Sequence, residues 1–298
     1  HLLGLGDPAE VPLLWPRPRE LHPLGGTVGL PERVTIAFPR AARPSAGLAW
    51  LGQALVERAH RLDEVAEGAG AWILLRIETA APREHYTLRI SDDGALITGG
   101  DTAALQHGLA TLAQLVTLAG PGPLALPRLT IADGPDFAER GVMLDVSRDR
   151  VPTLATLRTL IDRLASWKLN QLQLYMEHTF AYAGHERVWQ HASPFTPAEI
   201  VELDAYAAAR HVELVPNQNS FGHMERWLVH EPYRALAECP DGFEHPANWT
   251  GEPYGLCATD PRCLEFLEGL YDQLLVCFRS ERFNVGLDET IDLGHGRS

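Results

Sequence analysis

The sequence lacks any apolar run approaching the roughly 18 to 20 residues that a membrane-spanning helix needs, although 45% of its 298 residues are hydrophobic. Basic residues are also scarce, because 25 Lys and Arg stand against 39 Asp and Glu, for a net charge of −14. An excess of negative charge repels nucleic acid and anionic membranes. We therefore expect a globular protein whose partners include neither nucleic acid nor a membrane.

Cysteine is scarce as well, and none of the four thiols belongs to a C-x-x-C pair of the kind that indicates a zinc site. The sequence also lacks H-x-H and H-E-x-x-H spacings, so we expect no metal and no other cofactor. Free thiols are the expectation, with a Cys239–Cys257 disulfide left open for an exported protein. The chain starts at His1 without the pattern of an export signal, which favours the cytoplasm.

The first 135 residues read as short strands with one helix. Alternating apolar residues predict strands at Val34–Phe38 and Tyr86–Ile90, and Asp92-Asp93-Gly94 predicts the turn of a hairpin. Asp101 can cap a helix that has Leu105, Leu109, Leu112 and Val116 on one face. We expect residues 1–135 to form a small α+β domain in which a sheet is backed by a helix.

Residues 136–298 alternate between strand and helix patterns. Strands are predicted at 141–146, 171–176, 212–216 and 283–287, and helices are predicted to begin at Thr153, at the Thr196–Glu199 capping box and at Asp260-Pro261. Such alternation is typical of a parallel sheet with helical crossovers. The first strand is followed by Ser147-Arg148-Asp149-Arg150 rather than by a glycine-rich phosphate turn, which disfavours a nucleotide-binding fold.

Polar residues follow each of these four strands, as they do at the working face of a (β/α)8 TIM barrel. Arg148 follows the first strand and Glu177-His178 the second; Asn219 and His223 follow the third, and Asp288-Glu289 the fourth. A complete barrel takes about 250 residues, so this region is expected to supply only its first half, about four strands. The other half would come from a longer parent protein or from a second chain.

The Asp288-Glu289 doublet is the sharpest chemical feature. Neighbouring residues of a strand face opposite ways, so the two carboxylates are not expected to flank one bond symmetrically, as the paired carboxylates of ordinary glycosidases do. Unequal roles are therefore predicted for them. Read as metal ligands, His178, His223 and Asp288 would instead indicate a metal-dependent hydrolase, and this alternative stays open.

Four segments resemble the family 20 glycoside hydrolases, the β-N-acetylhexosaminidases. Asn284-Val-Gly-Leu-Asp288-Glu289 resembles their His-Ile-Gly-Gly-Asp-Glu signature, and Pro216–His223 resembles their Pro-Glu-Ile-Asp-Met-Pro-Gly-His segment. Arg140–Arg148 and Lys168-Leu-Asn170 are similar to their first barrel strand and to the turn into the second. The region ending at Leu126–Ile131 and Asp133 also resembles the small domain that precedes the barrel in that family.

The resemblance implies an exo-acting retaining enzyme that removes terminal β-linked GlcNAc or GalNAc from glycans. The acetamido oxygen of the substrate would attack C1 and form an oxazolinium intermediate, so that no enzyme nucleophile is needed. Asp288 would orient the acetamido group, and Glu289 would protonate the leaving oxygen and later activate water. Arg148 would bind sugar hydroxyls, and Glu177, His178, Asn219 and His223 would complete the substrate site.

The sequence departs from the family pattern at several of these positions. Asn284 stands in place of a His, Asn219 in place of an Asp, and Glu177-His178 where an Asp-Asp pair is usual. The segment Tyr175-Met-Glu177-His178-Thr179 is similar to a subgroup with Tyr-x-Glu-Asp-Thr. The departures leave the sugar preference open. Because strands five to eight of the barrel would supply the rest of the pocket wall, a non-catalytic carbohydrate-binding or scaffold fragment is the alternative function.

Overall fold

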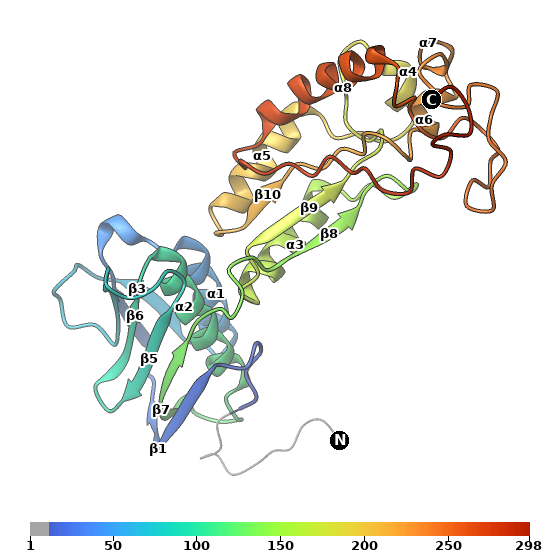
Figure 1. Cartoon of the computed structure of the whole chain (residues 1–298). Helices are drawn as coiled ribbons and strands as arrows, with labels where there is room; N and C mark the ends of the chain where they lie inside the picture. The colour runs from blue at the N-terminus through green and yellow to red at the C-terminus, as the bar shows by residue number, and fades with distance from the viewer. Residues whose placement is uncertain (1–11) are drawn as a thin grey trace. The chain divides into compact units, whose positions relative to one another are not determined.

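The computed structural model describes residues 12–298, which form two compact units (Figure 1). The first comprises the chain up to Glu139 together with Arg163–Leu169, and the second comprises Arg140–Asp162 and Asn170–Ser298. The start of the chain, on which the expectation about an export signal rests, lies outside the described residues. The assignment of domains to residues 1–135 and 136–298 stays a prediction.

The first unit contains a seven-stranded mixed sheet in the order β1-β7-β5-β6-β4-β2-β3. Its strands are β1 (Glu20–Gly29), β2 (Arg33–Ala37), β3 (Arg61–Glu64), β4 (Ile73–Ile77), β5 (Tyr86–Ser91), β6 (Gly94–Gly99) and β7 (Ala125–Asp133). The predicted hairpin is β5–β6, where Ile90 pairs with Ala95 across the turn. The predicted strand at Val34–Phe38 is β2, at the same place to within one residue.

Two helices, rather than the one predicted, pack in the apolar core of this unit. The predicted helix is α2 (Thr102–Leu118), and the Asp101 side chain accepts a hydrogen bond from the backbone N–H of Ala104. The helix that the sequence analysis missed is α1 (Ser45–Glu57), which packs against α2. Pro44, which precedes α1, offers no side-chain cap, so the usual starting signal of a helix is absent there.

The second unit contains a parallel three-stranded sheet in the order β10-β9-β8. Its elements are β8 (Gly141–Asp145), α3 (Leu154–Ser166, of which residues 163–166 are counted with the first unit), β9 (Gln171–Tyr175), α4 (Glu186–Trp189), α5 (Pro197–Ala208), β10 (Glu213–Val215), α6 (Glu225–Leu228), α7 (Glu231–Arg234) and α8 (Pro261–Leu274). The alternation of strand and helix confirms the predicted partial (β/α)8 barrel after an α+β region.

The three helix starts predicted in this part of the chain are confirmed. Thr196 and Glu199 form a reciprocal capping box at the start of α5, and Pro197 occupies its first turn. The Asp260 side chain accepts from the backbone N–H of Arg262 at the start of α8, and Thr153 accepts from the N–H of Thr156 at the start of α3. Local hydrogen-bonding residues therefore fix where these helices begin.

The fourth predicted strand, at residues 283–287, is instead an extended segment with one parallel bridge, between Asn217 and Asn284. A strand needs a continuous ladder of backbone hydrogen bonds, and Gly286 interrupts this one because its φ is positive, at 50°. At the opposite edge of the sheet, β8 exposes Val142 and Met143, at 40% and 57%. The sheet of this unit thus has the apolar edge expected of an incomplete barrel.

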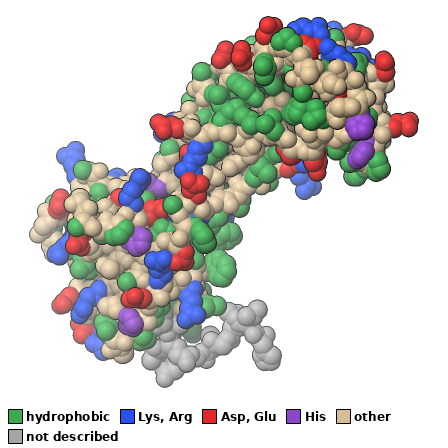
Figure 2. Space-filling view, in the orientation of Figure 1, with side chains coloured by type: hydrophobic (Ala, Val, Ile, Leu, Met, Phe, Trp, Pro, Cys, Tyr) green, Lys and Arg blue, Asp and Glu red, His purple; other side chains and the backbone are tan. Residues whose placement is uncertain are grey.

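In the part of the chain that the structure describes, no helix is both long and apolar enough to cross a membrane. Acidic and basic side chains are interspersed over the face shown in Figure 2. The four cysteines are free, as the sequence analysis expected, and all four are buried.

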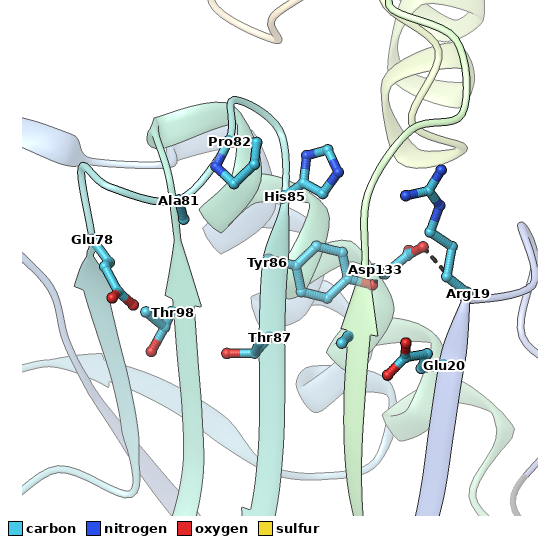
Figure 3. A pocket seen from close by; sticks show the side chains of 11 residues that line it. Arg19, Glu20, Glu78, Ala81, Pro82, His85, Tyr86, Thr87, Thr98 and Asp133 are labelled. Atoms are coloured by element: carbon cyan, nitrogen blue, oxygen red, sulfur yellow. Dashed lines mark hydrogen bonds between the residues drawn. The ribbon is translucent and has the colours of Figure 1, made fainter.

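A pocket in the first unit holds none of the predicted site residues (Figure 3). Its lining includes Glu78, His85, Tyr86 and Asp133. Lys168 Nζ lies 2.7 Å from the Asp133 carboxylate and 3.0 Å from the Tyr86 hydroxyl, so the buried polar groups of this pocket are already paired with each other.

Candidate active site

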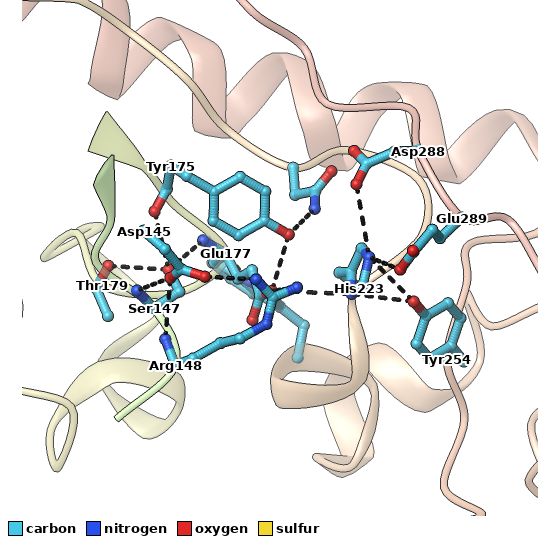
Figure 4. Close-up of polar contacts among 12 residues, drawn as sticks. Asp145, Ser147, Arg148, Tyr175, Glu177, Thr179, His223, Tyr254, Asp288 and Glu289 are labelled. Atoms are coloured by element: carbon cyan, nitrogen blue, oxygen red, sulfur yellow. Dashed lines mark hydrogen bonds and ion pairs between the residues drawn. The ribbon is translucent and has the colours of Figure 1, made fainter. Parts of the chain in front are cut away.

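The carboxyl-terminal ends of the parallel strands gather most of the predicted site residues (Figure 4). Arg148 follows β8, Glu177 follows β9 and Asn219 follows β10. In-register parallel strands end at the same edge of a sheet, so these three side chains are brought close together. His223 and the Asp288-Glu289 doublet reach the same place from loops.

The two acidic residues of the doublet converge on one imidazole. His223 Nε2 lies 2.9 Å from Glu289 Oε2 and 3.6 Å from Asp288 Oδ2. The expectation that the two side chains face opposite ways is therefore wrong. Strand alternation does not apply, because the segment is not a regular strand and Glu289 has a left-handed backbone with φ 50°. The tighter contact of Glu289 still supports unequal roles.

The loop that carries His223 fits closely beneath the doublet. A Cβ atom on Gly222 would lie 2.5 Å from the backbone carbonyl oxygen of Asp288, which is closer than packed atoms approach each other. The missing side chain therefore lets the two loops meet. This contact fixes the backbone of the doublet against His223.

His223 is buried, and its ring is held from two sides. The Tyr254 hydroxyl oxygen lies 2.9 Å from His223 Nδ1 and 3.2 Å from Nε2, the nitrogen that also contacts Glu289. Burial raises the pKa of Tyr254, and the nearby carboxylates of Glu225 and Glu289 raise it further. Tyr254 thus stays a neutral phenol that can exchange a hydrogen bond with the imidazole.

Glu177 is the most rigidly mounted residue of the cluster. Its backbone N–H donates to Ser147 Oγ at 2.8 Å, and its carbonyl accepts from Trp227 Nε1 at 2.7 Å and from Gln218 Nε2 at 2.9 Å. Its side chain is only 4% exposed. Burial raises the pKa of this carboxyl to about 7, and the charge of Glu225 adds to the effect. A carboxyl poised near neutrality in a cluster of polar groups is typical of functional sites.

Arg148 is held at the edge of the cluster. Its guanidinium pairs with the Asp145 carboxylate, lies 3.8 Å from Glu177 Oε1, and sits 5.2 Å from the centre of the Tyr175 ring. The side chain is still 59% exposed, so N–H groups remain accessible to a ligand. This arrangement suits recognition of hydroxyl groups.

His178 is the predicted site residue that the structure does not bring into this cluster. It lines a neighbouring polar pocket with Asp149, Arg150 and His191 among others. Its Nδ1 atom is buried without a hydrogen-bond partner, and burial lowers the pKa of the ring to about 4. The neutral ring suits packing beside the site better than a charged contact with substrate.

Sequence reasoning did not assign site roles to Tyr175, Tyr254 or Ser147. Tyr175 Oη lies 3.0 Å from Glu177 Oε1, and Ser147 Oγ holds the Glu177 backbone. Tyr175 could have been found from its place two residues before Glu177, since alternate strand residues share a face. Tyr254 comes from a long loop, where the sequence offers no comparable signal.

Within residues 12–298, no group of three or more His, Cys, Asp or Glu side chains is arranged to hold a metal ion. His223 and Asp288 are adjacent, whereas His178 is in the neighbouring pocket. The three residues of the metal-dependent alternative are thus not gathered around one point.

Comparison with known proteins matches both parts of the chain to one family. The model described as glycosyl hydrolase family 20, catalytic domain, matches residues 137–295, and the model for domain 2 of the same family matches residues 11–134. A beta-N-acetylhexosaminidase of Cellulomonas fimi is 26% identical over 77% of this chain and 49% of its own length. A beta-hexosaminidase of Vibrio furnissii is 26% identical over 96% of this chain and 50% of its own length.

Solved structures give the same result. A mutant Streptomyces plicatus beta-hexosaminidase in complex with the product GlcNAc matches with a TM-score of 0.76 and 26% identity, covering 93% of this chain and 59% of that one. The chain spans about half the length of these two curated relatives. Because the catalytic-domain model alone covers more than half of its residues, this chain belongs to glycosyl hydrolase family 20.

Proposed function

We propose that this chain carries the catalytic acid and the acetamido-orienting residue of an exo-acting, retaining β-N-acetylhexosaminidase. Its substrates would be glycans ending in β-linked GlcNAc or GalNAc. The observation that carries the proposal is the convergence of Asp288 and Glu289 on His223, at 3.6 and 2.9 Å, in a chain of this family. Relatives named as β-N-acetylhexosaminidases support the substrate class.

In the proposed reaction the substrate supplies its own nucleophile. The acetamido oxygen attacks C1, the bond from C1 to the leaving oxygen breaks, and Glu289 gives its proton to that oxygen. Asp288 stabilises the positive charge that develops on the acetamido group as the oxazolinium ring closes. Glu289 then takes a proton from water as the water attacks C1, which reopens the ring and retains the β configuration.

The surroundings of the doublet support these separate tasks. His223 holds Glu289 through Nε2 and is backed by Tyr254, which keeps the acid directed at one place. Arg148 presents exposed N–H groups that can bind sugar hydroxyls. Glu177 and Asn219 are buried behind these groups, so we propose that they position the catalytic residues rather than contact the sugar directly.

The openness of the site favours a second candidate for the isolated chain, namely sugar binding without turnover. The side chains of Asp288 and Glu289 are 52% and 65% exposed, and the electrostatic stabilisation of a transition state weakens when water has access. Further barrel strands, from a longer parent protein or from a second chain, would enclose them. The two candidates differ in whether the chain alone releases product.

The test combines turnover with binding. The purified chain is assayed with chromogenic β-GlcNAc and β-GalNAc glycosides, and binding of a GlcNAc-thiazoline, which mimics the oxazolinium intermediate, is measured by calorimetry. We expect thiazoline binding that Asp288→Asn weakens, and any turnover to be lost in Glu289→Gln. Binding without turnover would favour the second candidate for the chain alone. Neither binding nor turnover, or turnover unaffected by Glu289→Gln, would contradict the proposed function.

A further inference from the structure

Behind the doublet, four polar side chains form a connected row: Glu177, Tyr175, Asn219 and Asp288. The Tyr175 hydroxyl oxygen lies 3.0 Å from Glu177 Oε1 and 2.5 Å from the side-chain amide of Asn219. The other end of that amide lies 3.2 Å from Asp288 Oδ1. Figure 4 shows Tyr175 between Glu177 and the loop that carries Asp288. The row therefore links a buried carboxyl to a residue of the doublet.

The surroundings of Asn219 decide which way its amide points. On one side lie two acceptors, the Gly286 carbonyl oxygen and Asp288 Oδ1, and on the other lies the Tyr175 hydroxyl. Only the NH2 group can serve two acceptors, so it faces Gly286 and Asp288. The amide oxygen then accepts a hydrogen bond from Tyr175. A Cβ atom on Gly286 would lie 2.3 Å from the Asn219 amide, so glycine admits this close contact.

Counting hydrogens then fixes the other end of the row. A tyrosine hydroxyl has one hydrogen, and Tyr175 gives it to Asn219. The 3.0 Å contact with Glu177 therefore needs a hydrogen from Glu177, because an ionised carboxylate would set lone pairs against lone pairs in a buried place. We propose that Glu177 is protonated in the resting site and that a one-way chain of hydrogen bonds, from Glu177 through Tyr175 and Asn219, positions Asp288.

The charges around Glu177 are consistent with this assignment. The groups that face it are Tyr175 at 3.0 Å, Arg148 at 3.8 Å and His223 at 3.9 Å, with Glu225 and Asp145 acting at longer range. Burial and the two carboxylates raise its pKa to about 7, and Arg148 opposes the rise; Tyr175 opposes it only when its hydrogen turns to the ionised carboxylate. Burial likewise raises the pKa of Tyr175, so Tyr175 remains a phenol that can donate.

This chain of hydrogen bonds makes the orientation of Asp288 depend on the proton of Glu177, which lies three side chains away along the row. If Glu177 ionises, Tyr175 turns its hydrogen to that carboxylate, and the Asn219 oxygen loses its donor. Flipping the Asn219 side-chain amide then restores a hydrogen bond, because the NH2 group can donate to the Tyr175 oxygen. The flip places the amide oxygen, instead of the NH2 group, against Asp288. Tyr175, Asn219 and Glu177 are therefore positioning residues, and this role rests on the proposed function of Asp288.

The experiment uses the full chain and the thiazoline probe between pH 5.5 and 8.5. In the wild-type chain we expect affinity to fall about tenfold across neutrality, since one hydrogen bond to a charged group is lost. Tyr175→Phe breaks the row, so its affinity should be about tenfold weaker at pH 6 and lose that pH dependence. Tyr206→Phe is the matched control, because it removes a hydroxyl that donates to Asp162 at 2.8 Å on another face. Equal pH dependence in wild type and Tyr175→Phe would overturn the proposal.

A measurement on the unmodified chain covers the case in which Tyr175→Phe fails to fold or no thiazoline binds. Carbon-13 NMR of labelled glutamate side chains, assigned with Glu177→Gln, reports whether the Glu177 carboxyl is protonated at pH 6. A protonated carboxyl that titrates together with the Asn219 side-chain amide signals supports the chain of hydrogen bonds. A carboxylate already ionised at pH 6 overturns it. Absence of thiazoline binding would count against the proposed function, whereas the NMR result decides the hydrogen-bond chain.

Discussion

Replacing Glu177 by Gln should change how the stability of the protein depends on pH. Burial raises the pKa of this carboxyl from 4.5 to about 7. Below pH 4.5 both the folded and the unfolded chain hold the proton, so the stabilisation it provides is fully present. As pH rises from 4.5 to about 7, the unfolded chain releases the proton first, and the free energy of unfolding falls.

The size of the effect follows from the two pKa values. Each pKa unit corresponds to about 1.4 kcal/mol, so ionisation of Glu177 costs the folded chain roughly 3 kcal/mol above pH 7. That is a large share of the 5 to 15 kcal/mol by which domains are usually stable. Glutamine has nearly the same shape and cannot ionise, so Glu177→Gln should not show this loss.

Urea unfolding between pH 4.5 and 8.5 measures the effect. Trp227 is a suitable fluorescent reporter, because it is fully buried and its Nε1 donates to the Glu177 carbonyl. The free energy of unfolding of Glu177→Gln, relative to wild type, should rise by about 3 kcal/mol across this range. Glu268→Gln, an exposed change on α8, serves as the control. The same pH slope in Glu177→Gln and wild type would refute the reasoning.

Gly222→Ala would place a Cβ atom 2.5 Å from the Asp288 carbonyl oxygen, so we expect turnover or thiazoline binding to fall by up to about a hundredfold. Gly269→Ala, in open space on α8, is the control and should gain up to about 1 kcal/mol in thermal unfolding. Lys168→Met removes the ammonium that lies 2.7 Å from the buried Asp133 carboxylate, and urea unfolding should show a loss of about 3 to 5 kcal/mol; no measurable loss would contradict the pairing. EDTA should leave any turnover unchanged, and chelator-sensitive turnover would favour the metal-dependent alternative.

Local signals in the sequence predicted many of the elements correctly. Helix starts were readable because the capping residues Asp101, Thr196 and Asp260 act on backbone groups only two or three residues away. Helix α1 was missed because Pro44 offers no such cap. The segment at 283–287 was wrongly predicted to be a full strand. A strand forms only where a neighbouring segment supplies a ladder of backbone hydrogen bonds, and the apolar pattern of this segment does not reveal whether such a neighbour exists.

The sequence by itself determined the family resemblance, the order of α+β region and partial barrel, and the gathering of Arg148, Glu177, Asn219 and the doublet near one sheet edge. The resemblance and the place of the doublet follow from the motifs, whereas the order and the remaining side chains follow from the alternating strand and helix patterns and from the rule that parallel strands end together. Only the tertiary structure decided that both acids of the doublet turn to His223, that His178 lies in another pocket, and that Tyr254 completes the cluster. The reason is physical: burial and hydrogen-bond partners are set by residues distant in sequence, and these determine where a proton resides.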